Sequence, residues 1–323
     1  MTRSFMMTSR NETDTGFGIR RARLRYYSSD AAPGALTAKA SWQELTAKNF
    51  TRALRQEIQN FPLVPDAHNE AQSHLSLFVH GYNNGWADSV QRYASIQSRL
   101  YAGPNSLGVL VLYSWPSDGS AAAYLPDRED ARACAPDLAD ALVTLHDEIV
   151  LSQRAAALGG KPDAERFCRA KVSVIAHSMG CFVMQKALAA ASKRLNNPQL
   201  LTLLHQHVNV AADVDNDIFQ NGQPLDSDGM LMSNLCYRIA ALYSGLDPVL
   251  GASAGLKHFG KRRLGRSGLA DRNKVPDNVF DIDVSPLIAD TPGNKHSAVF
   301  ESAAAMELVR RILVGTDRGH LGD

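Results

Sequence analysis

The chain has 323 residues, of which 45% are hydrophobic and 21% charged, so its composition is that of a globular protein and not of a disordered one. The formal net charge at pH 7 is only +1, which gives no bulk electrostatic reason to expect nucleic acid or an anionic membrane as a partner. Four cysteines stand singly, without C-x-x-C spacing, and are expected to be free thiols in a reducing compartment: Cys134, Cys168, Cys181 and Cys236.

The sequence carries no recognisable targeting signal. Residues 1–10 lack the apolar run of about 7–15 residues that a secretory signal requires. No stretch of about 18 apolar residues occurs, so no transmembrane helix is expected. We therefore predict a cytoplasmic protein.

The first 64 residues are expected to form an N-terminal extension that packs on the main domain, residues 65–323. Charged and apolar residues alternate over 23–27, which suggests an edge strand with its charges facing outward. From Trp42 to about Phe61 apolar residues recur at helical spacing, which predicts a helix.

Downstream, apolar strands alternate with helices. Apolar runs predict buried strands at residues 75–79, 108–114, 172–175, 208–212, 237–243 and 279–284. Helical spacing predicts helices at about residues 88–100, 127–151, 181–188 and 298–314. This alternation predicts an α/β fold with a mostly parallel central sheet and helices on both faces. Ligand sites in such sheets lie at the carboxyl ends of the strands.

Residues 172–188 carry the strongest functional signal. A β-branched strand runs into Ala176-His177-Ser178-Met179-Gly180, and helix formers follow. This matches the nucleophile elbow G-x-S-x-G with Ala in the first glycine position, a turn so sharp that small residues must flank the serine at both positions two residues away. The elbow strains the serine backbone and places it at a helix N-terminus, which favours developing negative charge. Ser178 is the predicted nucleophile; the alternative is a buried serine in an ordinary strand–turn–helix unit.

A serine hydroxyl needs a base to take its proton and an acid to orient that base. His296 is the best placed of ten histidines, after the last predicted strand and before the closing helix. His177 lies in the elbow, where its side chain should point away from Ser178. Two further histidines are weaker alternatives for the base: His258 and His320.

The acid is expected between the serine and the histidine, the chain order of hydrolases with an α/β fold. Asp247 is the first choice, a few residues past the strand predicted at 237–243. Asp213 and Asp215 follow the preceding strand and remain open. Each of the three also fits an exposed turn or helix N-cap.

Two backbone N–H groups are expected to form an oxyanion hole, that of Met179 and that of Tyr82 in the loop after the strand at 75–79. Each such donor stabilises a tetrahedral intermediate by about 3 kcal/mol. Gly81 permits close backbone approach, and His80 before it is expected to be structural. Three aromatic residues are candidates for substrate binding, with core packing as the alternative: Trp86, Trp115 and Tyr124.

Two other signals are weaker. His205-x-His207 has the spacing of metal ligands on a strand, but no cysteine or carboxylate cluster accompanies it, so no metal site is expected. The basic stretch 257–274 could bind phosphate or an acidic partner, although a solvated loop fits it better. No organic cofactor is expected, and the oligomeric state is left open.

Together these segments resemble a bacterial family of α/β-hydrolase-fold proteins of unknown function with esterase- or lipase-like character. The resemblance covers about residues 65–315, and the H-G-Y-N and S-W-P-S pieces are together more specific than the elbow alone. The matching residues are Phe78–Asn83, Ser114–Ser117 with Tyr124, Asp127 and Glu129, Ala176–Gly180, Ala212–Asp215 with Phe219, Tyr243–Ser244 with Asp247, and His296–Ser297. The resemblance implies an α/β-hydrolase catalytic domain and a triad of Ser178, Asp247 and His296.

The sequence thus predicts a serine hydrolase that cleaves small-molecule carboxylic esters through an acyl-enzyme. Serine at the elbow disfavours aspartate-nucleophile chemistry. A thioesterase or acyltransferase with the same triad, or a non-catalytic binding protein on a hydrolase scaffold, remains an alternative.

Overall fold

The computed structural model describes residues 3–60, 64–65, 71–118, 124–159, 170–196, 201–256 and 260–321. Its centre is one sheet. The strands are β1 (Ser4–Glu12), β2 (Phe17–Ser29), β3 (Gln43–Leu45), β4 (Val64–Pro65), β5 (Ala71–Val79), β6 (Gly108–Ser114), β7 (Ala170–His177), β8 (Leu204–Val210), β9 (Cys236–Tyr243) and β10 (Val279–Asp283).

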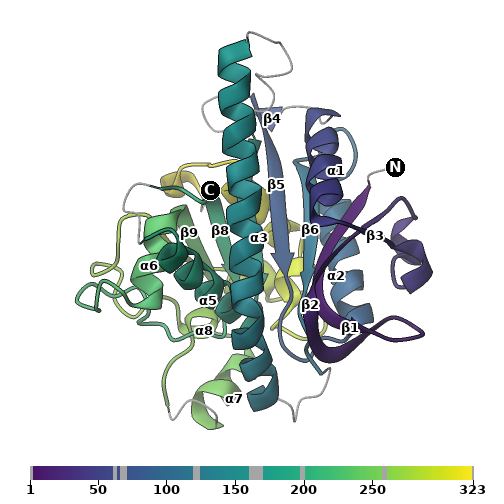
Figure 1. The fold of residues 1–323 in the computed structure, drawn as a ribbon. Coiled ribbons are helices and arrows are strands. Elements are labelled where there is room, and N and C mark those ends of the chain that lie inside the picture. Colours follow the sequence, from purple (N-terminus) through teal and green to yellow (C-terminus); the bar gives the residue numbers. More distant parts are fainter. Residues whose placement is uncertain are drawn as a thin grey trace.

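Across the sheet the strands follow the order β10-β9-β8-β7-β5-β6-β1-β2-β3, and β4 pairs with β5 beside this path. The pairings from β10 through β1 are parallel, whereas β2 and β3 are antiparallel to their neighbours. The parallel strands therefore end at one common edge of the sheet, the lower one in Figure 1. The predicted α/β fold with a mostly parallel sheet is confirmed.

Helices cover both faces of the sheet, as predicted (Figure 1). They are α1 (Ala47–Asn60), α2 (Trp86–Leu100), α3 (Tyr124–Gly159), α5 (Met179–Arg194), α6 (Asp228–Leu235), α7 (Pro248–Leu256), α8 (Leu264–Ser267), α9 (Ser285–Ile288) and α10 (Ala303–Leu313). The helices α1, α3, α5 and α6 pack on one face, and α2 and α10 pack on the other. In the described part of the chain, no helix combines the length and the apolar character that crossing a membrane requires.

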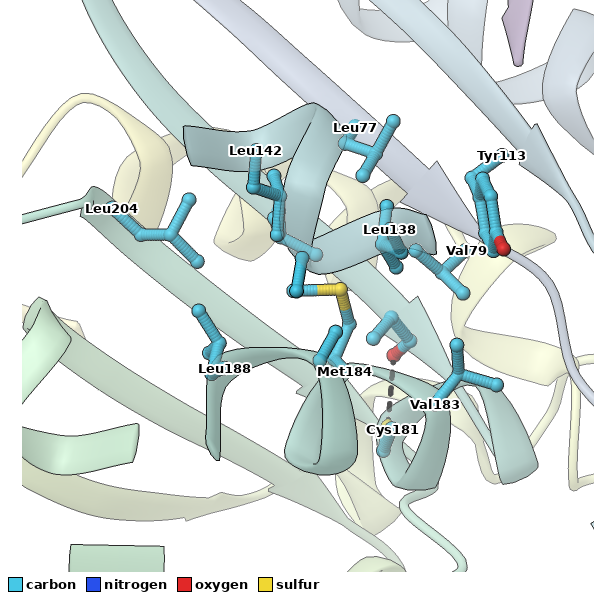
Figure 2. Packing of buried hydrophobic residues seen from close by; sticks show 14 of the residues in the cluster. Leu77, Val79, Tyr113, Leu138, Leu142, Cys181, Val183, Met184, Leu188 and Leu204 are labelled. Carbon is cyan, nitrogen blue, oxygen red and sulfur yellow. Dashed lines mark hydrogen bonds between the residues drawn. The ribbon is translucent and has the colours of Figure 1, made fainter. Parts of the chain in front are cut away.

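The helix that begins at the elbow is buried on several sides. Figure 2 shows Leu138 and Leu142 of α3 facing Val183, Met184 and Leu188 of α5 within one hydrophobic cluster. Because α5 lies between the sheet, α3 and α6, most of its residues are buried, and only a narrow stripe that includes Lys186 and Lys193 reaches solvent. Burying each large aliphatic side chain contributes about 1.5–3 kcal/mol, so the packing of α5 fixes the position of the elbow.

The strands predicted from apolar runs are all present, with ends that differ by a few residues. Residues 108–114 form β6 with the predicted bounds. The predicted helix at 42–61 starts later, at Ala47, because Gln43–Leu45 pairs with β2 as strand β3. The strand expected at residues 23–27 lies within β2, and the short strand β3 pairs only with Tyr26–Ser28 at the end of β2.

The N-terminal residues hold the main difference from the predicted fold. They supply β1, a buried strand that pairs in parallel with β6, so β1, β2 and β3 extend the central sheet itself. Because β1 contains several polar residues, the sequence pattern did not predict this strand. They are buried with partners, because Thr8 Oγ1 donates to the carbonyl of Ser114 over 2.8 Å and Ser9 Oγ lies 3.0 Å from the hydroxyl of Tyr113.

Candidate active site

Ser178 stands between β7 and α5 with φ 53° and ψ −122°, in the left-handed region that non-glycine residues rarely adopt. Such a conformation costs about 1–3 kcal/mol and persists only where its surroundings fix it. Here the Ser178 N–H donates to the carbonyl of Val210 over 3.0 Å. The Ser178 carbonyl accepts from the N–H groups of Cys181 and Asp213, both over 3.1 Å. This is the backbone that the elbow motif predicts.

Two glycines let the loop after β5 approach the elbow. A Cβ atom on Gly180 would lie 2.5 Å from the backbone oxygens of both Val79 and His80. A Cβ atom on Gly81 would lie 2.8 Å from Ser178 Cβ. Neither position has room for a side chain, so the sequence H-G-Y-N places its backbone directly against the serine.

His296 and Asp247 form a buried hydrogen-bonded pair. His296 Nδ1–H donates to Asp247 Oδ2 over 2.6 Å, and the other carboxylate oxygen accepts from the N–H of Leu250 over 3.0 Å. The bond to Asp247 leaves Nε2 as the nitrogen of His296 that can act as a base. Among the described residues, no hydrogen bond of ordinary length joins Ser178 Oγ to this ring. Catalytic bonds of this kind are often long without substrate and shorten when it binds.

The other two candidate acids have different partners. The Asp213 carboxylate accepts from Arg263 Nε over 2.8 Å, from the Tyr124 hydroxyl over 2.7 Å and from Ser253 Oγ over 3.1 Å. Asp215 accepts from the same guanidinium. Arg263 is completely buried. Of the three aspartates that the sequence left open, Asp247 is therefore the one that is hydrogen-bonded to His296.

His177 supports the loop that carries His296. Its Nε2–H donates to the backbone oxygen of His296 over 3.0 Å, and the two rings lie 4.9 Å apart between centroids. Burial holds the pKa of His177 well below its usual range, and the neighbouring His296 lowers it further. A neutral His177 ring can keep this bond without adding positive charge beside His296.

His80 has the structural role expected for it. Its Nε2 accepts from the backbone N–H of Trp115 over 3.2 Å, so Nδ1–H donates to the carbonyl of Gly81 over 2.8 Å. Burial lowers the pKa of His80 to about 3. The ring stacks on the Trp115 indole, whose Nε1–H donates to the His80 carbonyl over 2.8 Å. These contacts join the H-G-Y-N segment to the S-W-P-S segment.

The two residues predicted to supply oxyanion donors belong to the segments that meet at the serine. Met179 is the first residue of α5, where backbone N–H groups have no partner within the helix. Tyr82 follows Gly81 in the loop that touches the elbow, and its ring packs edge-on against Tyr124 at 5.4 Å. The loop is held from within, because Asn84 Nδ2 donates to the Tyr82 carbonyl over 2.8 Å.

The aromatic residues predicted to bind substrate lie mainly in packed surroundings. Trp115 is completely buried against His80. Trp86 packs against Phe17 with ring centroids 4.5 Å apart, and its indole N–H donates to a backbone carbonyl. Both indoles are buried, Trp86 against Phe17 of β2 and Trp115 against His80, as the alternative of core packing expects. Tyr124 is buried with its hydroxyl on Asp213, and its ring packs against Tyr82.

The remaining sequence signals do not converge on a second site. His207 is completely buried, and burial lowers its pKa to about 3, while the His205 ring stacks on Tyr237. The described residues contain no group of three or more His, Cys, Asp or Glu side chains that could hold a metal. His258 and the start of the basic stretch, residues 257–259, lie outside the described residues. His320 ends an exposed turn near the C-terminus.

Within the basic stretch, several cations are already paired inside the protein. Lys261 Nζ lies 3.5 Å from Asp215 and 3.7 Å from Asp217. Arg266 donates to the backbone carbonyl of Asp247, so it supports the segment that carries this carboxylate. Sequence patterns alone did not reveal Arg263 or Arg266 as neighbours of the site, because charged residues in a Gly-rich stretch usually face solvent.

The sequence matches a family of known proteins. The family model described as "Alpha/beta hydrolase of unknown function (DUF900)" matches residues 59–153 and 164–312, most of the chain. Among solved structures, the chain is similar to Aspergillus fumigatus lipase B with a TM-score of 0.42 and 12% sequence identity. That similarity covers 77% of this chain and 54% of the lipase, so the chain spans about half the length of that protein. No curated protein matches the sequence.

Proposed function

We propose that this chain, which belongs to the family of α/β-hydrolases of unknown function, is a serine hydrolase that cleaves carboxylic esters. The observation that carries the proposal is the buried His296–Asp247 bond of 2.6 Å, on the same edge of the sheet as a serine held in the strained elbow conformation. A histidine oriented by a carboxylate is the arrangement that activates a serine hydroxyl.

In the proposed reaction, Ser178 Oγ attacks the acyl carbon of the ester while His296 Nε2 takes its proton. Asp247 keeps the ring in the required tautomer and stabilises the imidazolium that forms. The N–H groups of Met179 and Tyr82 stabilise the oxyanion of the tetrahedral intermediate. His296 then returns the proton to the leaving alcohol, and an acyl-enzyme remains on Ser178. Water, deprotonated by His296, attacks the acyl carbon. The bond from that carbon to Ser178 Oγ then breaks, His296 returns the proton to Oγ, and the carboxylic acid is released.

The test is hydrolysis of p-nitrophenyl esters of increasing acyl length by the wild type and by Ser178→Ala. We expect turnover in the wild type and a fall of about 10³-fold or more in the variant, because the nucleophile is lost. Ser98→Ala, on the exposed surface of α2, is the matched control and should retain full activity. The acyl length that gives the highest kcat/KM indicates the size of the acyl pocket.

Labelling by a fluorophosphonate probe gives a second readout that does not depend on the ester chosen. Labelling of the wild type but not of Ser178→Ala, without ester turnover, would redirect the proposal to other acyl substrates such as acyl-CoA thioesters. Undiminished ester hydrolysis by Ser178→Ala would refute the proposed mechanism.

A further inference from the structure

We propose that Arg10, on the N-terminal strand β1, is a positioning residue for the oxyanion loop, defined here as residues 81–85. This inference rests on the proposed function, since that loop carries the N–H of Tyr82. Arg10 lies outside the family match, which begins at residue 59. The proposal makes the N-terminal segment part of the catalytic site.

The path of β1 brings Arg10 to the site. This strand pairs in parallel with β6, and Thr8 lies opposite Ser114, the last residue of β6. Arg10 is two residues further along and therefore stands beyond the carboxyl end of β6, at the edge of the sheet where the elbow lies. Its side chain is completely buried there.

The guanidinium of Arg10 joins the two loops that follow β5 and β6. Its Nη2 donates to the carbonyl of Asn84 in the oxyanion loop over 2.8 Å. Its Nη1 donates to the carbonyl of Ser117 over 3.2 Å and to that of Gly18 over 3.1 Å. Nε donates to Ser114 Oγ over 2.9 Å. One side chain thus holds β2, the end of β6 and both loops.

Asp127 holds the same two loops through complementary groups. Its carboxylate accepts from Ser117 Oγ over 2.6 Å and from the Asp118 N–H over 3.0 Å, and the backbone of Asn83 also bonds to it. Arg10 therefore binds carbonyl oxygens while Asp127 binds N–H and O–H donors. Both charged side chains are buried, which is tolerated only where hydrogen bonds replace the lost water.

A cation is needed at this position for a geometric reason. The planar guanidinium presents five N–H donors in fixed directions and can reach several carbonyls at once, whereas a lysine ammonium offers three donors at one point. Burial lowers the pKa of Arg10 to about 10, and the Asp127 carboxylate opposes that shift, so the side chain stays charged at neutral pH. Oxyanion donors act only when they are correctly placed, since a displacement of about 1 Å can cost about 10²-fold in rate.

The experiment compares Arg10→Met and Arg10→Lys with the wild type, with Arg20→Met on the exposed surface of β2 as the control. Hydrogen exchange is measured on peptides that contain residues 81–85 and 115–118. We expect exchange there to be about tenfold faster in Arg10→Met, less accelerated in Arg10→Lys, and unchanged in the control. Exchange in the peptides of α5 should stay as in the wild type, which separates local loosening from global unfolding.

Kinetics on a p-nitrophenyl ester supplies the second readout. Arg10→Met should lower kcat about 10- to 100-fold and leave KM within about twofold, because the loop stabilises the transition state and not the bound ester. A third variant, Arg10→Ala, leaves space for a free guanidinium ion. Millimolar guanidinium should therefore restore part of the kcat that this variant loses. A merely structural residue would change stability without this kcat-specific loss or this rescue.

The two proposals fail in different ways. Undiminished turnover by Ser178→Ala would overturn ester hydrolysis by the triad and would leave the exchange result for Arg10 standing. Unchanged exchange in residues 81–85, or unchanged kcat in a folded Arg10→Met, would overturn the role of Arg10 alone. Arg10→Lys keeps the test decisive where the methionine variant does not fold, because it retains the buried charge.

Discussion

Two aspartates follow neighbouring strands at the same edge of the sheet and have opposite surroundings. Asp213 comes after β8 and Asp247 after β9, and both are buried. Asp247 accepts a hydrogen bond from His296, 49 residues later in the chain. Asp213 accepts one from Arg263, 50 residues later. Near-identical positions in the fold thus receive different hydrogen-bond partners.

The difference shows that the partner and not the strand decides which carboxylate can serve as the acid. Arginine stays protonated under all ordinary conditions, so a carboxylate bound to Arg263 is fixed in a structural role. Histidine can take and return a proton near neutral pH, so a carboxylate bound to His296 can support catalysis. Tyr124 and Ser253 add further donors to Asp213 and tie α3 and α7 to it.

The largest expected effect comes from neutralising each aspartate in turn. Asp247→Asn should lower kcat about 10³- to 10⁴-fold, because the amide no longer holds the tautomer of His296 that leaves Nε2 as the base. Asp213→Asn, the matched control, should keep kcat within about threefold. Initial rates on a p-nitrophenyl ester, with circular dichroism as the check on folding, measure both. A larger kcat loss in Asp213→Asn would reverse the assignment of the acid.

The second effect is on stability and comes from removing the cation that Asp213 and Asp215 share. Arg263→Met leaves two carboxylates without their buried partner, and breaking such a pair costs about 3–5 kcal/mol. Urea denaturation should show this loss, and Asp213→Asn in the same chain should restore part of it. Lys261→Met, at the exposed pair with Asp215, should cost at most about 1 kcal/mol. Equal losses of unfolding free energy in Arg263→Met and Lys261→Met would mean that burial does not make the Arg263 pairs stronger than the Lys261 pair.

The comparison also explains how far the sequence could predict this site. The elbow was predictable because its determinants are local: a strand, a short turn with Gly180, and a helix, all within residues 172–188. The strands of the parallel sheet were predictable because each is a local run of apolar residues, although their ends differ by a few residues. The choice among Asp213, Asp215 and Asp247 was not, since it depends on Arg263 and His296 reaching the sheet edge from distant segments.

The same reasoning accounts for what the sequence patterns missed. Strand β1 carries Thr8, Ser9 and Arg10 in its buried part, and a polar run of this kind predicts a surface segment unless its partners are known. Trp86 and Trp115 were candidates for substrate binding, with core packing as the alternative. The packing that covers them comes from β2 and from His80, which no local pattern reveals.

The buried histidines also differ in whether a carboxylate lies beside them. His296 faces a carboxylate, whereas His80 and His207 are buried without one. Burial lowers the pKa of each of these two to about 3, against about 6.5 for histidine in an unfolded chain. The folded state then binds fewer protons than the unfolded state between these values. Their contribution to stability is therefore complete above about pH 6.5 and is lost as the pH falls towards 3.

The smallest predicted effect isolates His207, which lies away from the proposed chemistry on β8. Neither of its ring nitrogens has a hydrogen-bond partner among the described residues, so His207→Leu should leave stability at pH 7 unchanged or raised. Between pH 7 and pH 5 the wild type should lose about 2 kcal/mol more than the variant, because only the unfolded wild-type histidine gains a proton there. Urea denaturation at the two pH values measures the difference. Equal losses would show that His207 is protonated in the folded protein, and thus that burial without a carboxylate does not keep a histidine of this sheet neutral.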